Sequence, residues 1–153
     1  MEHIFNQFSQ QSIGIIVFAL FLLLLFKNRI LSKLYGIRFI HAEDAFDLFK
    51  TPAKSLFLDI RTRWELDHEP RIKASVAIPL PELKTRMDEL KGKGLDRTVI
   101  LICRSGSRAV SAGILLKREG FSDLCILSGG MNAWQRGDYP VTRPKKQIKR
   151  SYG

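Results

Sequence analysis

The sequence predicts an α/β fold: a mainly parallel sheet with helices on both faces, preceded by one transmembrane helix. The first observation is that apolar runs with strand character alternate with helical stripes between residues 39 and 136. The second is that these strand-like runs are continuously apolar, as in parallel strands that are buried on both faces. The third is an uncharged, apolar stretch that precedes them near the N-terminus.

The N-terminal stretch has the composition of a membrane anchor. Ile13–Phe26 is an unbroken apolar run of fourteen residues, and its polar flank Gln10–Ser12 carries no charge. A helix needs roughly 20 residues to span a membrane, which the run and its uncharged flank supply together. We therefore expect residues 12–26 to lie in a membrane and residues 1–37 to form an anchor with a basic juxtamembrane linker.

Three alternatives to an anchor fit the sequence less well. A cleaved signal peptide has a basic first region and small residues at its cleavage site, whereas Glu2 is acidic and bulky residues follow Phe26. A core helix or an interfacial helix would show a polar side, and this run has none. The nearby basic residues all follow the run, so the positive-inside rule predicts a single-pass protein with its N-terminus outside and its folded domain in the cytoplasm.

The elements of the domain follow in order. Apolar runs predict strands at Phe39–His41, Ser55–Asp59, Val76–Ile78, Thr98–Ile102 and Leu124–Leu127. Between and after them, apolar stripes predict helices at Ala42–Phe49, Trp64–Glu69 (a short helix or turn), Pro81–Leu90, Ala109–Glu119 and Met131–Arg136. Pro52 ends the first of these helices, Gly92 and Gly94 break the third, and Gly120 caps the fourth.

The net charge of +10 is concentrated at the two ends of the chain. The middle is close to neutral, which argues against a nucleic-acid-binding domain, because such a domain carries its positive charge on a folded face. Residues 143–153 include five basic residues and no acidic one. We expect a mobile basic tail, either simply solvated or in contact with anionic lipid head groups.

The run Cys103–Arg108 joins a predicted strand to the start of a predicted helix. Backbone N–H groups at a helix N-terminus lack intrahelical partners and the dipole there is positive, so an anion such as a thiolate is stabilised. Arg104 and Arg108 add positive charge, and Gly106 lets the loop curl so that its N–H groups converge. The alternative is an inert, buried cysteine at a strand end.

Motifs on both sides of this loop identify a family. They are Leu58–Thr62 with Trp64-Glu65, then Ile78–Leu80, and downstream of the loop Leu127–Trp134 and Tyr139–Val141. Together with the Cys103 loop, in this order, they resemble a single rhodanese domain over residues 38–142. The resemblance implies a sulfurtransferase whose catalytic Cys103 takes sulfur from a donor such as thiosulfate, holds it as a persulfide and passes it to a thiol or cyanide.

The same resemblance implies roles for the neighbouring residues. The active-site loop comprises Arg104, Ser105, Gly106, Ser107 and Arg108, with Arg104 recognising the anionic donor. Supporting pairings are expected from Asp59, Arg61 and Glu65, with Arg108 bound to one of the carboxylates. Neither a cofactor nor a metal is expected, because the three histidines are scattered along the chain. Cys125 lies inside an apolar strand and is expected to be inert.

Loop length distinguishes this pattern from related phosphatases. Rhodanese-like loops have six residues, whereas protein tyrosine phosphatases place an Arg six positions after the Cys, where this chain has Ala109. One departure from the rhodanese pattern is Arg71, which replaces the usual His, while His68 is out of register. Two other functions stay open: a non-catalytic docking module at the membrane, and a thiol redox sensor that uses Cys103.

Overall fold

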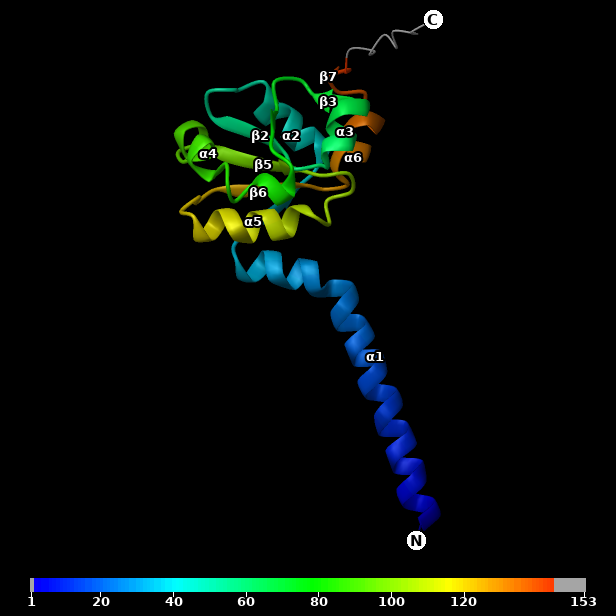
Figure 1. Ribbon diagram of the computed structural model, residues 1–153. Coiled ribbons are helices and arrows are strands. Elements are labelled where there is room, and N and C mark those ends of the chain that lie inside the picture. The colour runs from blue at the N-terminus through cyan, green and yellow to red at the C-terminus, as the bar shows by residue number, and fades with distance from the viewer. Residues whose placement is uncertain (1, 145–153) are drawn as a thin grey trace, which may run out of the picture.

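A five-stranded sheet forms the centre of the structure, a computed structural model that describes residues 2–144 (Figure 1). Its order is β1-β6-β5-β2-β4, and every neighbouring pair is parallel. The strands are β1 (Arg38–Ile40), β2 (Ser55–Asp59), β4 (Val76–Ala77), β5 (Thr98–Ile102) and β6 (Leu124–Leu127). The predicted parallel sheet is therefore confirmed, and each strand begins and ends within one residue of its predicted bounds.

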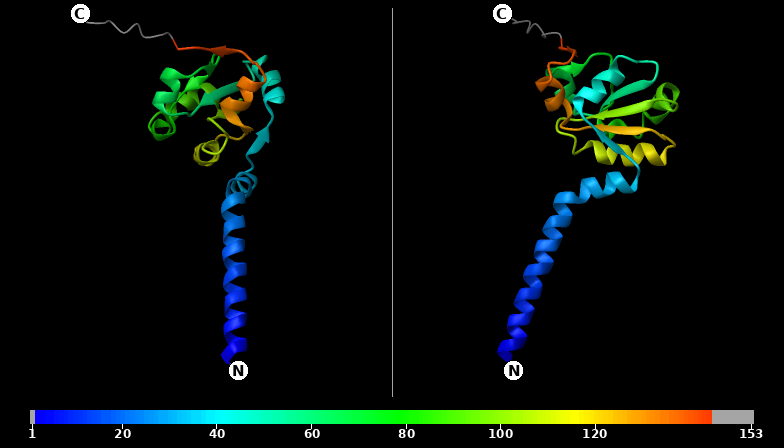
Figure 2. Two further views of the ribbon diagram at one scale, coloured as in Figure 1. Left: turned by 90° about the vertical axis from the view of Figure 1, so that its right-hand side faces the viewer. Right: turned by 180° about the vertical axis from the view of Figure 1, so that it is seen from behind.

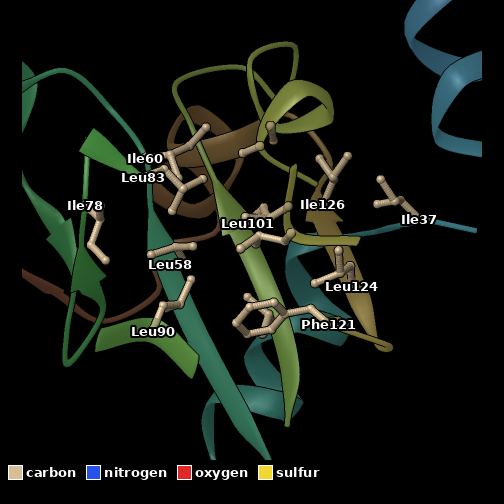
Figure 3. Packing of buried hydrophobic residues seen from close by; sticks show 14 of the residues in the cluster. Ile37, Leu58, Ile60, Ile78, Leu83, Leu90, Leu101, Phe121, Leu124 and Ile126 are labelled. Carbon is tan, nitrogen blue, oxygen red and sulfur yellow. The ribbon is translucent and has the colours of Figure 1, made fainter. Parts of the chain in front are cut away.

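Helices lie on both faces of this sheet (Figures 1 and 2). They are α2 (Ala42–Phe49), α3 (Arg63–His68), the 3₁₀ turn η1 (Leu80–Glu82), α4 (Met87–Gly94), α5 (Ala109–Arg118) and α6 (Gly130–Arg136). Alternate residues of the central strands serve opposite faces. Leu101 belongs to the cluster packed by α4 and α5, shown in Figure 3, whereas its neighbour Ile100 packs with Trp134 of α6.

The predicted helix Pro81–Leu90 is wrong in its bounds. The chain forms η1 first and begins α4 only at Met87, because Arg86 has a non-helical backbone (φ −106°, ψ 20°). Gly92 and Gly94 do not break the helix, since α4 continues to Gly94. A Cβ on Gly94 would lie 2.6 Å from Leu56 Cδ2, so this glycine allows α4 to approach the sheet closely.

A second, antiparallel sheet was not predicted. It pairs β3 (Arg71–Ile72) with β7 (Val141–Thr142), and two residues per strand are too few to show a periodic pattern. Trp134 fixes this corner, because its Nε1–H donates to Pro140 O at 3.1 Å and its ring is fully buried. Trp134 therefore anchors the second sheet to the core.

One long helix, α1 (Glu2–Leu34), precedes the domain, and it is long and apolar enough to cross a membrane. The helix continues through residues 27–34, which fall within the basic juxtamembrane linker expected in residues 1–37. This part bends away from the rest of α1 and runs beside α5 (Figures 1 and 2). Ile37 then enters the core above Gly113, where a Cβ would lie only 2.7 Å from Ile37 Cδ1.

The apolar part of α1 stays outside the domain. From Ile13 to Phe26 its large side chains are more than a third exposed. The basic tail predicted for residues 143–153 lies outside the described residues from residue 145 onward, so its expected lipid contact stays a prediction.

Candidate functional site

Cys103 lies at the carboxyl edge of the parallel sheet, where ligands bind in open α/β folds. It follows β5 directly, and the last residue of that strand, Ile102, is in register with Asp59 at the end of β2. The loop then leads into α5, whose first helical residue is Ala109. The structure therefore brings Cys103 and Asp59 to one edge of the sheet, although 43 residues separate them in the chain.

The Cys103 sulfur receives a hydrogen bond from its own loop. The backbone N–H of Gly106 donates to Sγ at 3.1 Å, and Gly106 adopts a left-handed conformation (φ +99°) that favours glycine. The Ser105 and Ser107 hydroxyls lie 3.4 Å apart on the exposed side of the loop. A backbone N–H held in this way stabilises negative charge on sulfur before any reaction begins.

The start of α6 holds the loop from the other side. Met131 and Asn132 donate their N–H groups to Cys103 O and Arg104 O at 2.9 and 3.2 Å. A Cβ on Gly130 would collide with the Cys103 carbonyl oxygen, and Gly130 also has a positive φ of 56°. Gly130 is thus needed for close backbone approach, a requirement that no sequence pattern revealed.

Arg108 and Glu65 form a two-pronged ion pair beside the sulfur. Arg108 Nη1 and Nη2 donate to Glu65 Oε2 and Oε1 at 2.9 and 2.7 Å, which confirms that Arg108 binds one of the expected carboxylates. Glu65 also completes a capping box with Thr62 at the start of α3. The Arg108 hydrogen bonds are the main cause that lowers the pKa of Glu65 from 4.5 to about 2.

This ion pair also affects the charge near the sulfur. The pKa of Arg108 is raised, first by its hydrogen bonds with Glu65 and further by its electrostatic interaction with Cys103. Glu65 therefore keeps a fixed, fully charged guanidinium next to Cys103, while its own carboxylate is neutralised by that cation.

We expect the stabilising effect of Glu65 to disappear in acid. Its pKa is lower in the folded chain, so its contribution is complete above about pH 4.5 and is lost as the pH falls toward 2. At pH 7 Glu65→Gln should lower the free energy of unfolding by roughly 2–3 kcal/mol, allowing for screening of the partly exposed Arg108. Urea unfolding in detergent at several pH values should show the difference between the two proteins shrinking from pH 4.5 to pH 2.5. A difference that is independent of pH would contradict this account.

A second ionic network lies deeper and was only partly expected. The Arg61 side chain is fully buried; its Nε and Nη2 donate to Asp59, and its Nη2 also donates to Pro70 O at 2.8 Å. Its Nη1 binds Glu69 Oε2 at 3.1 Å, and Glu69 Oε1 in turn lies 3.4 Å from Nη1 of Arg104. The structural pairing predicted for Asp59 and Arg61 is present in this form.

Glu69 is a further site residue that sequence reasoning missed. It joins the buried Arg61 to Arg104, whose side chain is 58% exposed. Nothing in the local sequence marks this role, because Glu69 is one acidic residue among several in its region.

Burial does not distinguish the two cysteines, because both are enclosed by protein. The two cysteines differ in their partners. The Sγ atom of Cys103 accepts a hydrogen bond from the Gly106 N–H and lies near Arg108. Burial in the strand raises the pKa of the Cys125 thiol. Cys103 itself has no exposed surface in this structure.

Arg71, which replaces the usual rhodanese His, and the nearby His68 both lie in contacts away from the Cys103 sulfur. Arg71 is part of β3, and His68 stacks on Trp64 with ring centroids 5.0 Å apart. Within residues 2–144 no group of three or more His, Cys, Asp or Glu side chains is placed to hold a metal ion.

Known proteins resemble this chain in sequence and fold. A family model described as "Rhodanese-like domain" matches residues 42–137. A protein from Allochromatium vinosum named "Sulfurtransferase" is 33% identical over 90 residues, which cover 59% of this chain and 80% of the relative. "Thiosulfate sulfurtransferase GlpE" of Pseudomonas putida is 36% identical over 54 residues, covering 35% of this chain and 48% of the relative.

A solved structure agrees in sequence and shape. The rhodanese-related protein from Thermoplasma volcanium is 30% identical with a TM-score of 0.60, and the match covers 69% of this chain and 97% of that one. The family model spans more than half of the chain and includes the Cys103 loop, both ionic networks and the start of α6. The chain therefore belongs to the rhodanese-like domain family.

Proposed function

We propose that this chain is a membrane-anchored sulfurtransferase that carries a sulfane sulfur as a persulfide on Cys103. The observation that carries the proposal is the hydrogen bond of 3.1 Å from the Gly106 N–H to the Cys103 sulfur, in a loop whose Arg108 is fixed by Glu65. These groups are placed to stabilise the two anions of the reaction, the thiolate and the persulfide. The relatives named as thiosulfate sulfurtransferases support thiosulfate as a donor.

The proposed reaction consists of two successive nucleophilic displacements on sulfur. In the first, the Cys103 thiolate attacks the outer sulfur of thiosulfate; a new S–S bond forms, and the old one breaks to release sulfite. In the second, an acceptor thiolate or cyanide attacks the terminal sulfur, takes it, and returns Cys103 to the thiolate. Arg104 would bind the anionic donor on entry, which requires its contact with Glu69 to open.

The proposal places the domain at the cytoplasmic side of a membrane. The exposed apolar part of α1 supports an uncleaved anchor with the N-terminus outside, and the basic residues that follow it support this orientation. The complete burial of Cys103 favours one alternative, a docking module that does not turn over sulfur.

One experiment tests both parts of the proposal. Membranes that contain the full chain are washed with alkaline carbonate, treated with thiosulfate and analysed by intact mass. We expect the uncleaved chain to remain in the membranes and to gain about 32 Da, the mass of one sulfur, because the Cys103 thiolate is reactive. A soluble, shortened chain would refute the anchor, and an unchanged mass would refute the persulfide in favour of the docking module.

A further inference from the structure

A cavity lies between the last turns of α1 and the catalytic loop. Its volume is about 230 Å³, and its walls include Asn28 and Arg29 of α1, Ser105 and Ser107 of the loop, and Ser128 after β6. In Figures 1 and 2 this end of α1 runs below α5, whose first turn follows the loop. The cavity therefore joins the segment next to the proposed anchor to the loop that carries Cys103.

The walls of this cavity provide the groups that bind a phosphate. Arg29 supplies a guanidinium, Asn28 an amide, and three serines supply hydroxyl groups. Its described lining contains no acidic side chain, and within residues 2–144 no carboxylate lies within 4.0 Å of the Arg29 guanidinium. The Arg29 guanidinium carbon lies over the Phe39 ring, 6.0 Å from its centroid, which leaves the N–H donors of Arg29 available for an anion.

The position of the cavity along α1 points to a lipid as the source of that phosphate. Asn28 and Arg29 come directly after Lys27, where the exposed apolar run of α1 has just ended. If this run lies in the bilayer, as the proposed function holds, the next helical turn lies at the depth of the head groups. Acyl chains of a lipid bound there would follow the apolar face of α1, while the head group would enter the cavity.

We propose that this cavity binds the phosphate of an anionic phospholipid and so fixes the catalytic loop to the membrane surface. The bound phosphate bridges Arg29 of α1 to the hydroxyls of Ser105 and Ser107. It thereby restrains the residues on either side of Gly106, whose N–H holds the Cys103 sulfur. The inference rests on the anchored arrangement proposed above, and it adds a lipid site that acts on the loop.

Hydrogen exchange of the full chain in nanodiscs tests the proposal. The nanodiscs contain phosphatidylcholine with an increasing fraction of phosphatidylglycerol, and the measured quantity is the protection of the backbone amides of residues 104–108. We expect protection to rise with the anionic lipid. Arg29→Gln should need about tenfold more phosphatidylglycerol for half-maximal protection, because a charge-assisted contact is lost.

Lys33→Gln is the matched control. It removes the same charge from the same helix outside the cavity lining, and it should change the half-maximal fraction less than about twofold. Both variants should show wild-type exchange in the strands in pure phosphatidylcholine, which verifies that they fold. Equal shifts in the two variants would overturn the site in favour of general charge attraction. Equal protection by millimolar inorganic phosphate without anionic lipid would overturn the lipid assignment.

The nanodisc experiment distinguishes failure of the lipid site from failure of the proposed function. A chain that does not enter nanodiscs refutes the anchor itself, and a chain that enters them but shows no lipid-dependent protection refutes only this site. Sulfur transfer is not part of the measurement, so an inactive Cys103 would not obscure the result.

Discussion

Replacing Cys103 with serine is expected to reduce thiosulfate:cyanide sulfur transfer to the uncatalysed background. A serine hydroxyl does not ionise at neutral pH and cannot carry a sulfane sulfur, so neither displacement can occur. The fold should persist, because the loop is held by backbone bonds from Met131 and Asn132 and by the Arg108–Glu65 pair rather than by the sulfur alone. Cyanide-dependent thiocyanate formation and a urea unfolding curve of the same preparation measure the two effects.

Cys125→Ser is the matched control, since Cys125 is equally buried but lies within β6. It should keep most of the activity and lose about 1–2 kcal/mol of stability, because a hydroxyl replaces a thiol in an apolar strand. Alkylation should also label Cys103 first. If Cys103→Ser turns over like the wild type, or if Cys125 is labelled first, the persulfide mechanism is wrong.

Arg61→Ala should be the most destabilising of the substitutions considered, by about 3–5 kcal/mol. Asp59 and Arg61 are both fully buried, so removing the guanidinium leaves the Asp59 carboxylate without its cation and leaves Pro70 O without a donor. Glu69 would lose one partner too, and Arg104 would be held less firmly as a result. The free energy of unfolding is measured by urea titration of the full chain in detergent at pH 7.

The exposed pair Arg63–Glu82 provides the control for this prediction. Its atoms are as close as 2.6 Å, but the Arg63 side chain is 63% exposed, so Arg63→Ala should cost no more than about 1 kcal/mol. Replacing both buried partners, with Asp59→Leu and Arg61→Met, should recover much of the loss, because no unpaired charge then remains at these positions. Similar losses for Arg61→Ala and Arg63→Ala would show that burial does not set the cost.

The sequence by itself determined the sheet and the place of Cys103 in it. Continuous apolar runs such as Thr98–Ile102 show strands that are buried on both faces, and their alternation with helical stripes requires parallel order. The next residue then has to lie at the carboxyl edge of the sheet, ahead of a helix. These features depend on neighbouring residues and on the local period of the chain, so they can be read without the fold.

The exposed apolar helix could also be predicted from the sequence, because its composition alone distinguishes it from the domain. Local sequence was misleading only where competing signals were close together, as between Pro79 and Gly94. There the non-helical Arg86 divided a stripe that looked continuous, and packing against Leu56 kept Gly94 in a helix.

Only the tertiary structure decided which groups meet around the loop. From the sequence alone, Arg108 could pair with any of several acidic residues. The position of α3 in the fold selects Glu65, 43 residues away. The roles of Glu69 and Gly130 depend on distances between segments that the sequence does not fix, and so does the cavity between Arg29 and Ser105. The physical reason is that ion pairs and close backbone contacts are set by how whole surfaces pack, whereas secondary structure is set mainly by residues within a few positions of each other.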